Sequence, residues 1–363
     1  MNVLHFKSAF PQGGAEKLLL YFLKASKEDV TVAIMNDEVD EYLKQELLIT
    51  CSKVYFLNRK LGHKHPKYLF PLMKIIKENK IDIIHSHDPG SMMWSILCKI
   101  IKPKLKLVLT IHSSVFVKNW NKITLFCNRN FINSNIAISE TILNDCIQNN
   151  LKTVKIFNGI DTKKWEQHIG GAGTFSIITV GRITYEGSIS YQIKGHDILL
   201  KALKECKKKS MKFSCNIVGG DVDHINNSSL KYLEKLNEDL DLSDEIKFLG
   251  NREDIPELLA QSDLFILPSR FEGLPVALLE AMAARLPVIA SNISGSAEIL
   301  EHERNGLLFE SENYLDLADK IFYLYNHREE MKRLEQNAYE YVHGFDISMM
   351  CEKYWELYKR LIQ

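Results

Sequence analysis

Two glutamates with seven residues between them, Glu272 and Glu280, lie in the segment PSRFEGLPVALLEAM (268–282). The apolar run that ends at Pro268 predicts a buried strand, and Pro275 suits the first turn of a following helix, where no N–H is needed. A helix that begins just past the carboxyl end of a parallel strand lies where open α/β sheets bind ligands. This segment therefore predicts a ligand site.

The expected ligand at this junction carries a phosphate. Free N–H groups at Gly273, Leu274 and Val276, together with the helix dipole, can hold a phosphate group. Glu280 would lie about 7.5 Å further along the helix, where its carboxylate could bind ribose hydroxyls. Glu272, in the turn, could bind sugar hydroxyls or support positive charge at an anomeric carbon. On spacing alone, a capped junction with one surface glutamate and one buried glutamate explains the pattern as well.

The elements that would position these residues alternate along the whole chain, which is typical of parallel sheets with helices on both faces. We predict strands at 30–36, 53–57, 81–87, 105–112, 135–139, 153–157, 175–181, 213–219, 246–250, 264–268, 287–291 and 307–310. We predict helices at 15–25, 68–79, 195–207, 229–239, 254–260, 275–284, 313–326, 329–343 and 347–362. A length of 363 residues favours two domains, with a boundary near the glycine-rich GGAGT.

Composition places the chain among cytoplasmic globular proteins. Hydrophobic residues make up 45% and charged residues 25%. No run reaches the roughly 18 apolar residues of a membrane span, and Pro11, Gly13 and Gly14 interrupt any leader-like pattern. The seven cysteines are odd in number and show no CxxC spacing. We therefore expect reduced thiols and a cytoplasmic location, without a disulfide framework or a zinc site.

The net charge of zero conceals an asymmetry. Residues 1–165 hold 24 basic and 14 acidic side chains, and the totals of 46 each leave 22 and 32 for the remainder. The excess is densest from Lys53 to Lys122, where lysines mix with aromatic and aliphatic residues. This mixture suits an anionic acceptor or peripheral contact with the anionic inner face of the plasma membrane. A solvated helix face with a buried stripe fits equally well, and no nucleic-acid-binding motif accompanies the charge.

A series of motifs in a fixed order covers nearly the whole chain. In the first half they are GGAEKLLL (13–20), DIIHSH (82–87), LTIH (109–112), AISE (137–140) and FNGID (157–161). In the second half they are VGRI (180–183), KGHDILLKAL (194–203), IVGG (217–220), the long segment 246–283 and NGLLF (305–309). Together they closely resemble the retaining glycosyltransferases of family 4, the group 1 glycosyltransferases.

The resemblance implies the GT-B fold, which consists of two Rossmann-like, doubly wound parallel-sheet domains facing a central cleft. We expect an acceptor-side domain at 1–165 that the C-terminal helix, 347–363, rejoins, and a nucleotide-sugar-binding domain at 166–346.

The resemblance also assigns roles to individual residues. Glu280 would hold the ribose, and Glu272 would contact the transferred sugar. Arg182 and Lys194 would neutralise the departing diphosphate, which is the electrostatic help that this leaving group requires.

Three further assignments fall in the first half. Gly13 and Gly14 would form a loop whose N–H groups approach the donor, as glycine allows. His112 would lie near the sugar and the acceptor, and His87 is a candidate acceptor contact. A strand-end histidine with one backbone partner is the structural alternative for His112.

Two features depart from the family pattern or compete with it. Arg182 and Lys194 are twelve residues apart, about twice the usual spacing, so the insertion TYEGSISYQI (184–193) puts the geometry of the lysine in doubt. Asp221 and Asp223 form a DxD sequence like the metal-binding motif of another glycosyltransferase fold. Because Arg182, Lys194 and a helix N-terminus can serve the diphosphate, we expect no metal and no other cofactor.

The sequence therefore predicts a retaining glycosyltransferase that moves a hexose-type sugar from a nucleotide-sugar, with UDP as the family default. The acceptor would be a saccharide or a lipid-linked molecule in bacterial surface polysaccharide or glycolipid synthesis, and no nucleic acid would be bound. Three alternatives stay open: another GT-B enzyme such as a sugar-nucleotide epimerase or a phosphorylase, a non-catalytic nucleotide-sugar-binding or scaffold subunit, and an inverting enzyme.

Overall fold

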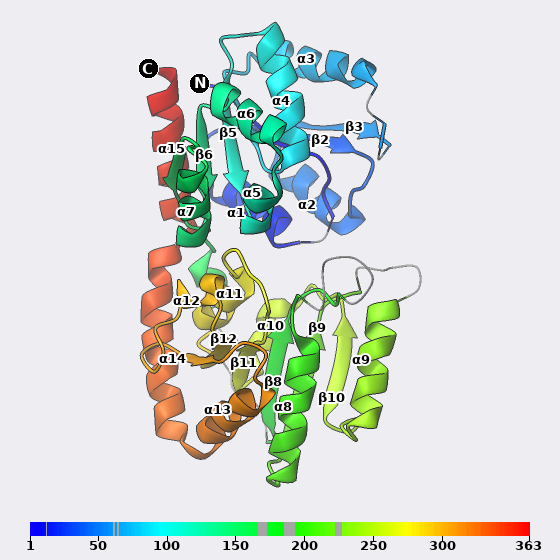
Figure 1. Ribbon diagram of the computed structural model, residues 1–363, viewed down its shortest axis with the longest axis vertical. Helices are drawn as coiled ribbons and strands as arrows, with labels where there is room; N and C mark the ends of the chain where they lie inside the picture. Colours follow the sequence, from blue (N-terminus) through cyan, green and yellow to red (C-terminus); the bar gives the residue numbers. More distant parts are fainter. Residues whose placement is uncertain (12, 61, 64, 166–172, 185–192, 222–226) are drawn as a thin grey trace. The chain divides into compact units, whose positions relative to one another are not determined.

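The computed structural model describes the whole chain except residues 12, 61, 64, 166–172, 185–192 and 222–226. The chain divides into two compact units, described separately below (Figure 1). The first unit comprises Met1–Ile160 and Phe345–Gln363, and the second comprises Asp161–Gly344. The sequence had placed these boundaries after residues 165 and 346.

The first unit is built on a seven-stranded parallel sheet with the order β3-β2-β1-β4-β5-β6-β7 (Figure 1). Its strands are β1 (Val3–Lys7), β2 (Thr31–Asn36), β3 (Val54–Arg59), β4 (Ile83–Ser86), β5 (Lys106–Ile111), β6 (Ser134–Ala137) and β7 (Thr153–Lys155). Its helices are α1 (Gly14–Ala25), α2 (Glu41–Thr50), α3 (Leu69–Glu78), α4 (Pro89–Ile101), α5 (Ser114–Asn119), α6 (Lys122–Phe131), α7 (Glu140–Gln148) and α15 (Ile347–Ile362).

The last helix, α15 (red in Figure 1), returns to the first unit and packs against α1. Its buried face includes Met350, Tyr354, Leu357 and Tyr358, which join the core formed by α1 and the sheet. The tyrosine hydroxyls have polar partners there, since buried tyrosines need one: Tyr358 bonds His85, and Tyr354 lies 3.4 Å from the Thr110 hydroxyl.

The second unit is built on a six-stranded parallel sheet with the order β10-β9-β8-β11-β12-β13. Its strands are β8 (Phe175–Val180), β9 (Phe213–Val218), β10 (Ile246–Gly250), β11 (Leu264–Leu267), β12 (Val288–Ser291) and β13 (Leu307–Phe309). Its helices are α8 (His196–Lys208), α9 (Ser228–Asp239), α10 (Ile255–Ala260), α11 (Val276–Ala283), α12 (Ser294–Ala297), α13 (Tyr314–Asn326) and α14 (Arg328–Val342).

These two units confirm the predicted fold class of two doubly wound parallel sheets. Most strands are continuous apolar runs that are buried on both faces, as helices covering both sides of a parallel sheet require. The strand that our sequence analysis did not predict is β1 (VLHFK), whose two polar residues, His5 and Lys7, are buried.

The strand order locates the ligand-binding edge of each sheet. In an open α/β sheet, ligands bind outside the carboxyl ends of the strands, at the point where the strand order reverses direction. That point lies between β1 and β4 in the first unit and between β8 and β11 in the second. The loops after these four strands carry most of the residues that the sequence singles out.

Candidate active site

A cluster of three polar side chains follows β11 in the second unit. The Lys194 ammonium lies 2.5 Å from Oε1 of Glu272, and the Ser269 hydroxyl donates to the same oxygen at 2.7 Å. The Glu272 side chain is 11% exposed and that of Lys194 is 25% exposed, so the ion pair is largely shielded from water. Because Lys194 reaches Glu272, the long insertion before it has not displaced the lysine from the β11 loop. Most of that insertion, 185–192, lies outside the described residues.

Glycines allow this cluster to form. Gly195 has a φ of +64°, and a Cβ there would lie 1.9 Å from the Pro268 carbonyl oxygen. Gly295, in α12, also contacts the β11 turn closely, since a Cβ there would lie 2.7 Å from the Glu272 carbonyl oxygen. The start of α8, the β11 turn and α12 thus approach so closely that side chains at these two glycines would separate them.

Arg270 also holds the turn after β11 in place, and our sequence analysis gave it no role. Its N–H donates to the Ile193 carbonyl at 2.7 Å, and its guanidinium donates to both oxygens of Asp197 at 2.8 and 2.9 Å. Glu312 accepts two more hydrogen bonds from it. Hydrogen bonds to Asp197 raise the pKa of Arg270 further above its usual range. Arg270 and Asp197 belong to the sequence motifs PSRF (268–271) and KGHD (194–197), but only the folded structure shows that they pair.

The start of α11 has no side-chain cap. Pro275 is its N-cap and offers no side-chain hydrogen bond to the first turn. The helix begins at Val276, one residue later than predicted. Gly273 is partly exposed, whereas Leu274 and Pro275 are buried. Glu280, in the middle of α11, is 4% exposed and is engaged with neighbouring groups.

Arg182 lies in the loop after β8, across the switch point from the β11 turn. Its side chain is exposed and forms no ion pair with any described residue. The loop is held by its backbone, since the Ile183 N–H donates to the Gly220 carbonyl and a Cβ on Gly219 would lie 2.1 Å from the Gly181 carbonyl. This exposed cation therefore lies on a short backbone segment, 181–183, that is hydrogen-bonded to the loop after β9.

Asp221, the first residue of the DxD sequence, has a structural function. It is 4% exposed, and its Oδ2 accepts from the Leu230 N–H at 2.8 Å in the first turn of α9. Such a bond satisfies one of the orphan N–H groups of a helix start. Asp223 lies outside the described residues.

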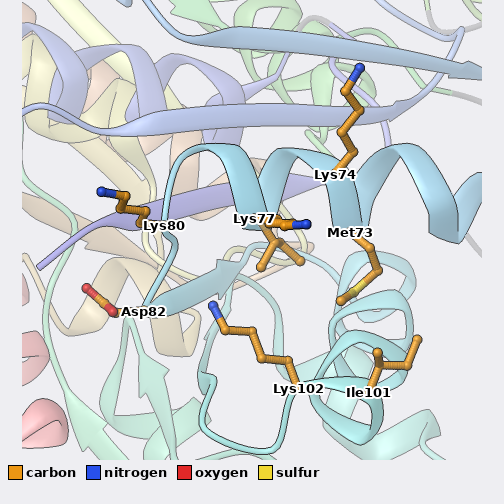
Figure 2. Close-up of a pocket in the computed structure, with 8 residues that line it drawn as sticks. Met73, Lys74, Lys77, Lys80, Asp82, Ile101 and Lys102 are labelled. Carbon is orange, nitrogen blue, oxygen red and sulfur yellow. The ribbon is translucent and has the colours of Figure 1, made fainter.

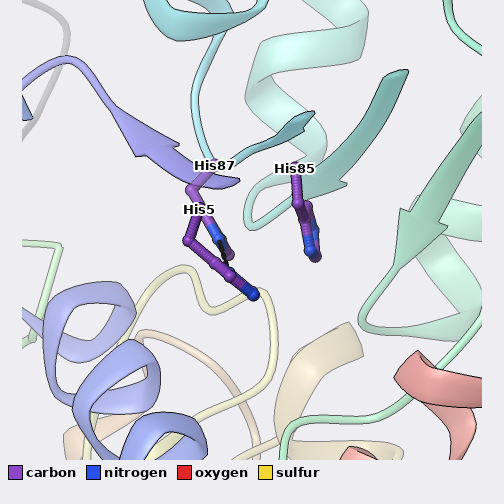
Figure 3. A group of neighbouring side chains, drawn as sticks. All are labelled: His5, His85 and His87. Carbon is purple, nitrogen blue, oxygen red and sulfur yellow. Dashed lines mark hydrogen bonds between the residues drawn. The ribbon is translucent and has the colours of Figure 1, made fainter. Parts of the chain in front are cut away.

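A row of four histidines lies at the switch point of the first unit. His5 comes from β1, His85 from β4, and His87 and His112 follow β4 and β5. Nδ1 of His5 lies 3.0 Å from Nε2 of His87 (Figure 3). The rings of His85 and His87 are stacked with centroids 4.4 Å apart, and those of His87 and His112 lie 5.9 Å apart.

Burial keeps these histidines neutral. Burial, with a smaller contribution from the charge of Lys7, lowers the pKa of His112 to about 3. Burial alone lowers the pKa of His5 to about 3, and burial followed by the neighbouring histidines lowers the pKa of His85 and His87 well below the usual value. A neutral imidazole has one nitrogen that can accept a hydrogen bond, for example from a sugar hydroxyl. Nε2 of His112 is buried and has no hydrogen-bond partner among the described residues.

Three of these imidazoles could in principle hold a metal, because one nitrogen from each of His5, His85 and His87 lies within 4.8 Å of the others. Both nitrogens of His85 and one nitrogen each of His5 and His87 already form hydrogen bonds with protein groups, whereas Nε2 of His5 is buried without a hydrogen-bond partner among the described residues. His85 bonds the hydroxyls of Tyr358 and Thr110, and His5 bonds His87. The pattern is that of a packed polar network in which each histidine fixes the next.

The glycine loop of the first unit adjoins an ion pair that the sequence analysis missed. Lys7, at the end of β1, lies 2.6 Å from Glu16 in the first turn of α1, and both side chains are nearly buried. A Cβ on Gly13 would lie 2.4 Å from the Glu16 carboxylate, whereas a Cβ on Gly14 would meet nothing within 4 Å. Gly13 thus serves close packing and Gly14 leaves open space. His87, expected as an acceptor contact, is only 6% exposed.

Sequence comparisons relate both units to sugar-transferring enzymes. The family model described as "Glycosyltransferase Family 4" matches residues 12–164, and the model described as "Glycosyl transferases group 1" matches residues 176–341. An Escherichia coli UDP-Gal:α-D-GlcNAc-diphosphoundecaprenol α-1,3-galactosyltransferase is 26% identical over 318 residues, which cover 81% of this chain and 79% of that protein. A Campylobacter jejuni N,N′-diacetylbacillosaminyl-diphospho-undecaprenol α-1,3-N-acetylgalactosaminyltransferase is 33% identical over 147 residues, 40% of this chain and 37% of that protein.

Structural comparison gives the same fold. The structure of Anabaena HepE in complex with UDP-glucose superposes with a TM-score of 0.85 at 22% sequence identity, covering 99% of this chain and 100% of that one. At this level of identity the likeness establishes the two-domain GT-B architecture.

Proposed function

Because the chain belongs to the family 4, group 1 glycosyltransferases of the GT-B fold, we propose that it transfers a hexose-type sugar from UDP to a saccharide or lipid-linked acceptor, with retention of anomeric configuration. The observation that carries the proposal is the Lys194–Glu272–Ser269 cluster at the switch point of the second unit, beside the α11 N-terminus. In this proposal Lys194 would face the negative diphosphate of a nucleotide-sugar, and Glu272, held by Ser269, would face the hydroxyls of its sugar.

The donor would be held by the second unit. The N–H groups around Gly273 and the α11 dipole would bind the diphosphate, and Glu280 would bind the ribose. Lys194 and Arg182 would neutralise the charge that develops on the diphosphate as its bond to the anomeric carbon breaks. Glu272, held by Ser269 and Lys194, would contact the sugar hydroxyls or the positive charge at that carbon.

The first unit would serve the acceptor. The neutral His112, whose Nε2 lacks a hydrogen-bond partner among the described residues, could bind the transferred sugar or orient the acceptor hydroxyl. The new bond would form on the face from which the diphosphate leaves, and the acceptor proton would pass to the departing phosphate oxygen. That transfer needs no protein nucleophile and is consistent with a neutral, non-basic histidine.

Two finer points rest on relatives. The HepE structures with UDP and UDP-glucose support a uridine donor. The names of the Escherichia coli and Campylobacter jejuni relatives specify diphosphoundecaprenol-linked acceptors, which supports a lipid-linked acceptor. We also propose that no metal is needed, because Lys194 and Arg182 supply cations at the diphosphate and Asp221 is occupied by the α9 backbone.

A nucleotide panel tests the donor part of the proposal. A ligand that binds only the folded state at about 100 times its Kd stabilises it by roughly 2.7 kcal/mol, which a thermal shift detects. We expect UDP to raise the melting temperature without added metal and GDP and ADP to do so less. The Glu280→Gln variant should need about tenfold more UDP for the same shift, since a hydrogen bond to a charged group is lost. A shift with GDP alone, or none with any nucleotide, would refute the uridine donor.

A product analysis tests the rest. With the UDP-sugar that the panel selects and a lipid diphosphate-linked saccharide, NMR of the new linkage should show the donor's own anomeric configuration. An inverted linkage would refute retention. An epimerised nucleotide-sugar without transfer would refute glycosyl transfer altogether.

A further inference from the structure

The first unit has a pocket that lies apart from the histidines. A pocket of about 690 Å³ opens where the ends of α3 and α4 meet the start of β4 (Figure 2). Four lysines and one aspartate line it together with apolar side chains: Lys74, Lys77, Lys80, Lys102, Asp82, Met73, Ile76 and Ile101. Figure 2 shows Met73 and Ile101 at one end of the pocket and Lys80 and Asp82 at the other.

Positive charge dominates this pocket. Asp82 already accepts a hydrogen bond from the Asn2 N–H at 2.9 Å, and Lys74 lies 3.7 Å from Glu78 in a mostly exposed pair. Lys77 and Lys80 are exposed, and neither is part of an ion pair within the described chain. The pocket therefore presents a net positive charge to whatever approaches it.

The pocket lies at the edge of the sheet opposite the candidate active site. Asp82 immediately precedes β4 and His87 immediately follows it, and four strand residues at about 3.3 Å each separate the two edges. Because all seven strands are parallel, their amino ends share this edge, and Lys53, Lys106 and Lys152 lie there as well. The lysines at this edge affect one another, because burial, and then the charges of Lys106 and Lys152, lower the pKa of Lys99.

An exposed apolar stripe adjoins the lysines. Met93, Leu97, Ile100 and Ile101 of α4 are 40, 43, 58 and 56% exposed. Their spacing of four, seven and eight residues places them on one face of the helix. On α3, Phe70 is 77% exposed and stands four and seven residues before Lys74 and Lys77, so it shares their face. Large apolar side chains gathered on a surface usually mark an interaction site.

We propose that this surface, formed by α3, α4 and the lysine pocket and here called the α3–α4 face, docks the protein on an anionic lipid bilayer. The lysines would contact headgroup phosphates, and the α4 stripe with Phe70 would enter the boundary with the acyl chains. The proposed contact is interfacial. No helix in the described part of the chain has the length and hydropathy needed to cross a bilayer. The α3–α4 face fits a bilayer better than a nucleic acid, because a phosphodiester backbone offers nothing to the apolar stripe. This inference concerns membrane contact and goes beyond glycosyl transfer.

The test is co-flotation of the full chain with vesicles of phosphatidylcholine alone and of an equal mixture of phosphatidylcholine and phosphatidylglycerol. We expect binding to the mixed vesicles, weakened by salt, and little binding to phosphatidylcholine. The variant Lys74→Glu/Lys77→Glu should lower the partition coefficient at least about 30-fold, because each lysine near an anionic surface contributes roughly fivefold. The control Lys231→Glu/Lys235→Glu makes the same charge change on exposed positions of α9 and should leave binding unchanged.

A second pair of variants tests the apolar stripe. Leu97→Gln/Ile100→Gln should lower the partition coefficient about tenfold, since it removes apolar area that would leave water. Leu48→Gln/Ile49→Gln is its control, because these α2 side chains are 45 and 82% exposed on another helix of the same unit. Circular dichroism would confirm that each variant is folded.

Several results would overturn the proposal. They are equal binding to both vesicle types, equal losses in the variants and their controls, or absence of binding to either vesicle. Binding to duplex DNA that is lost in Lys74→Glu/Lys77→Glu while vesicle binding is retained would assign the face to nucleic acid instead. Transfer to a water-soluble acceptor should be unchanged in all four variants, so failure of the docking proposal is distinguishable from failure of the proposed function.

Discussion

The buried histidines should make the first unit sensitive to mild acid. Burial holds the pKa of His5 and His112 at about 3 and lowers those of His85 and His87 in the same direction. An unfolded histidine titrates near pH 6.5. Between these values the unfolded chain binds protons that the folded unit excludes. The free energy of unfolding is therefore unaffected above pH 7 and falls as the pH decreases from about 6.5 toward 3.

The size of this loss follows from the two pKa values. For one histidine whose pKa is 6.5 unfolded and about 3 folded, lowering the pH from about 7 to about 5.5 removes roughly 1.3 kcal/mol. His5 and His112 together remove about 2.5 kcal/mol, and His85 and His87 add to this. In the second unit, burial lowers the pKa of His196 to about 4, which removes about 1.2 kcal/mol over the same interval. Stabilities of domains are roughly 5–15 kcal/mol, so the difference is measurable.

Native-state hydrogen exchange measured by mass spectrometry resolves the two units. After correction for intrinsic exchange rates, the opening free energy of peptides from β4 and β5 should fall at least twice as much between pH 7 and 5.5 as that of peptides from β8 and β9. Carboxylates titrate mainly below this window, so histidines dominate it. The His5→Gln variant should show a smaller pH dependence by about one proton. His63→Gln/His65→Gln, at exposed positions of the same unit, should show none of this reduction.

Equal losses in the two units would refute the reasoning, as would an opening free energy in β4 and β5 that is independent of pH. Either result would mean that these histidines titrate in the folded unit as they do in the unfolded chain. It would contradict the conclusion that burial keeps them neutral.

Two further substitutions probe how the site is held. Gly195→Ala should destabilise the second unit by at least about 2 kcal/mol and disturb the β11 turn, because its Cβ would lie 1.9 Å from the Pro268 carbonyl at a φ of +64°. Gly250→Ala is the matched control in urea unfolding, since its φ of +63° is similar but its Cβ would meet nothing within 4 Å; it should cost about 1 kcal/mol. Tyr358→Phe should lower the stability of the first unit by roughly 1–3 kcal/mol because it leaves a nitrogen of buried His85 without its partner. If the Tyr358→Phe variant unfolds at the same urea concentration as the wild type, the hydrogen bond between Tyr358 and His85 does not contribute to stability.

Much of the fold could be predicted because apolar runs and helical periodicity report burial directly. Among the strands, the exception is β1, which shows the limit of that signal. His5 and Lys7 make the strand look amphipathic, yet both are buried because His87 and Glu16 lie beside them. Those partners come from the loop after β4 and from α1, and no local pattern in the sequence reveals such pairings between separate elements.

The candidate site shows the same division. The types and positions of Glu272, Lys194 and His112 could be singled out from the sequence, because the motifs place Glu272 and His112 after strands and Lys194 just before a helix. Their contacts could not, since the ion pair between Lys194 and Glu272 depends on β8 and β11 being neighbours. Arg270 was missed for the same reason, because its partner Asp197 lies on a different helix.

The most direct test of the proposed function is the turnover of Glu272→Gln with the UDP-sugar and acceptor that the wild-type protein uses. This change removes the carboxylate charge but keeps its shape. We expect kcat to fall about 10²–10³-fold, as when a group that stabilises transition-state charge is lost, while the protein stays folded. Glu257→Gln, at an exposed position of α10 in the same unit, should retain wild-type turnover. Wild-type turnover in Glu272→Gln would contradict the assignment of this cluster as the active site.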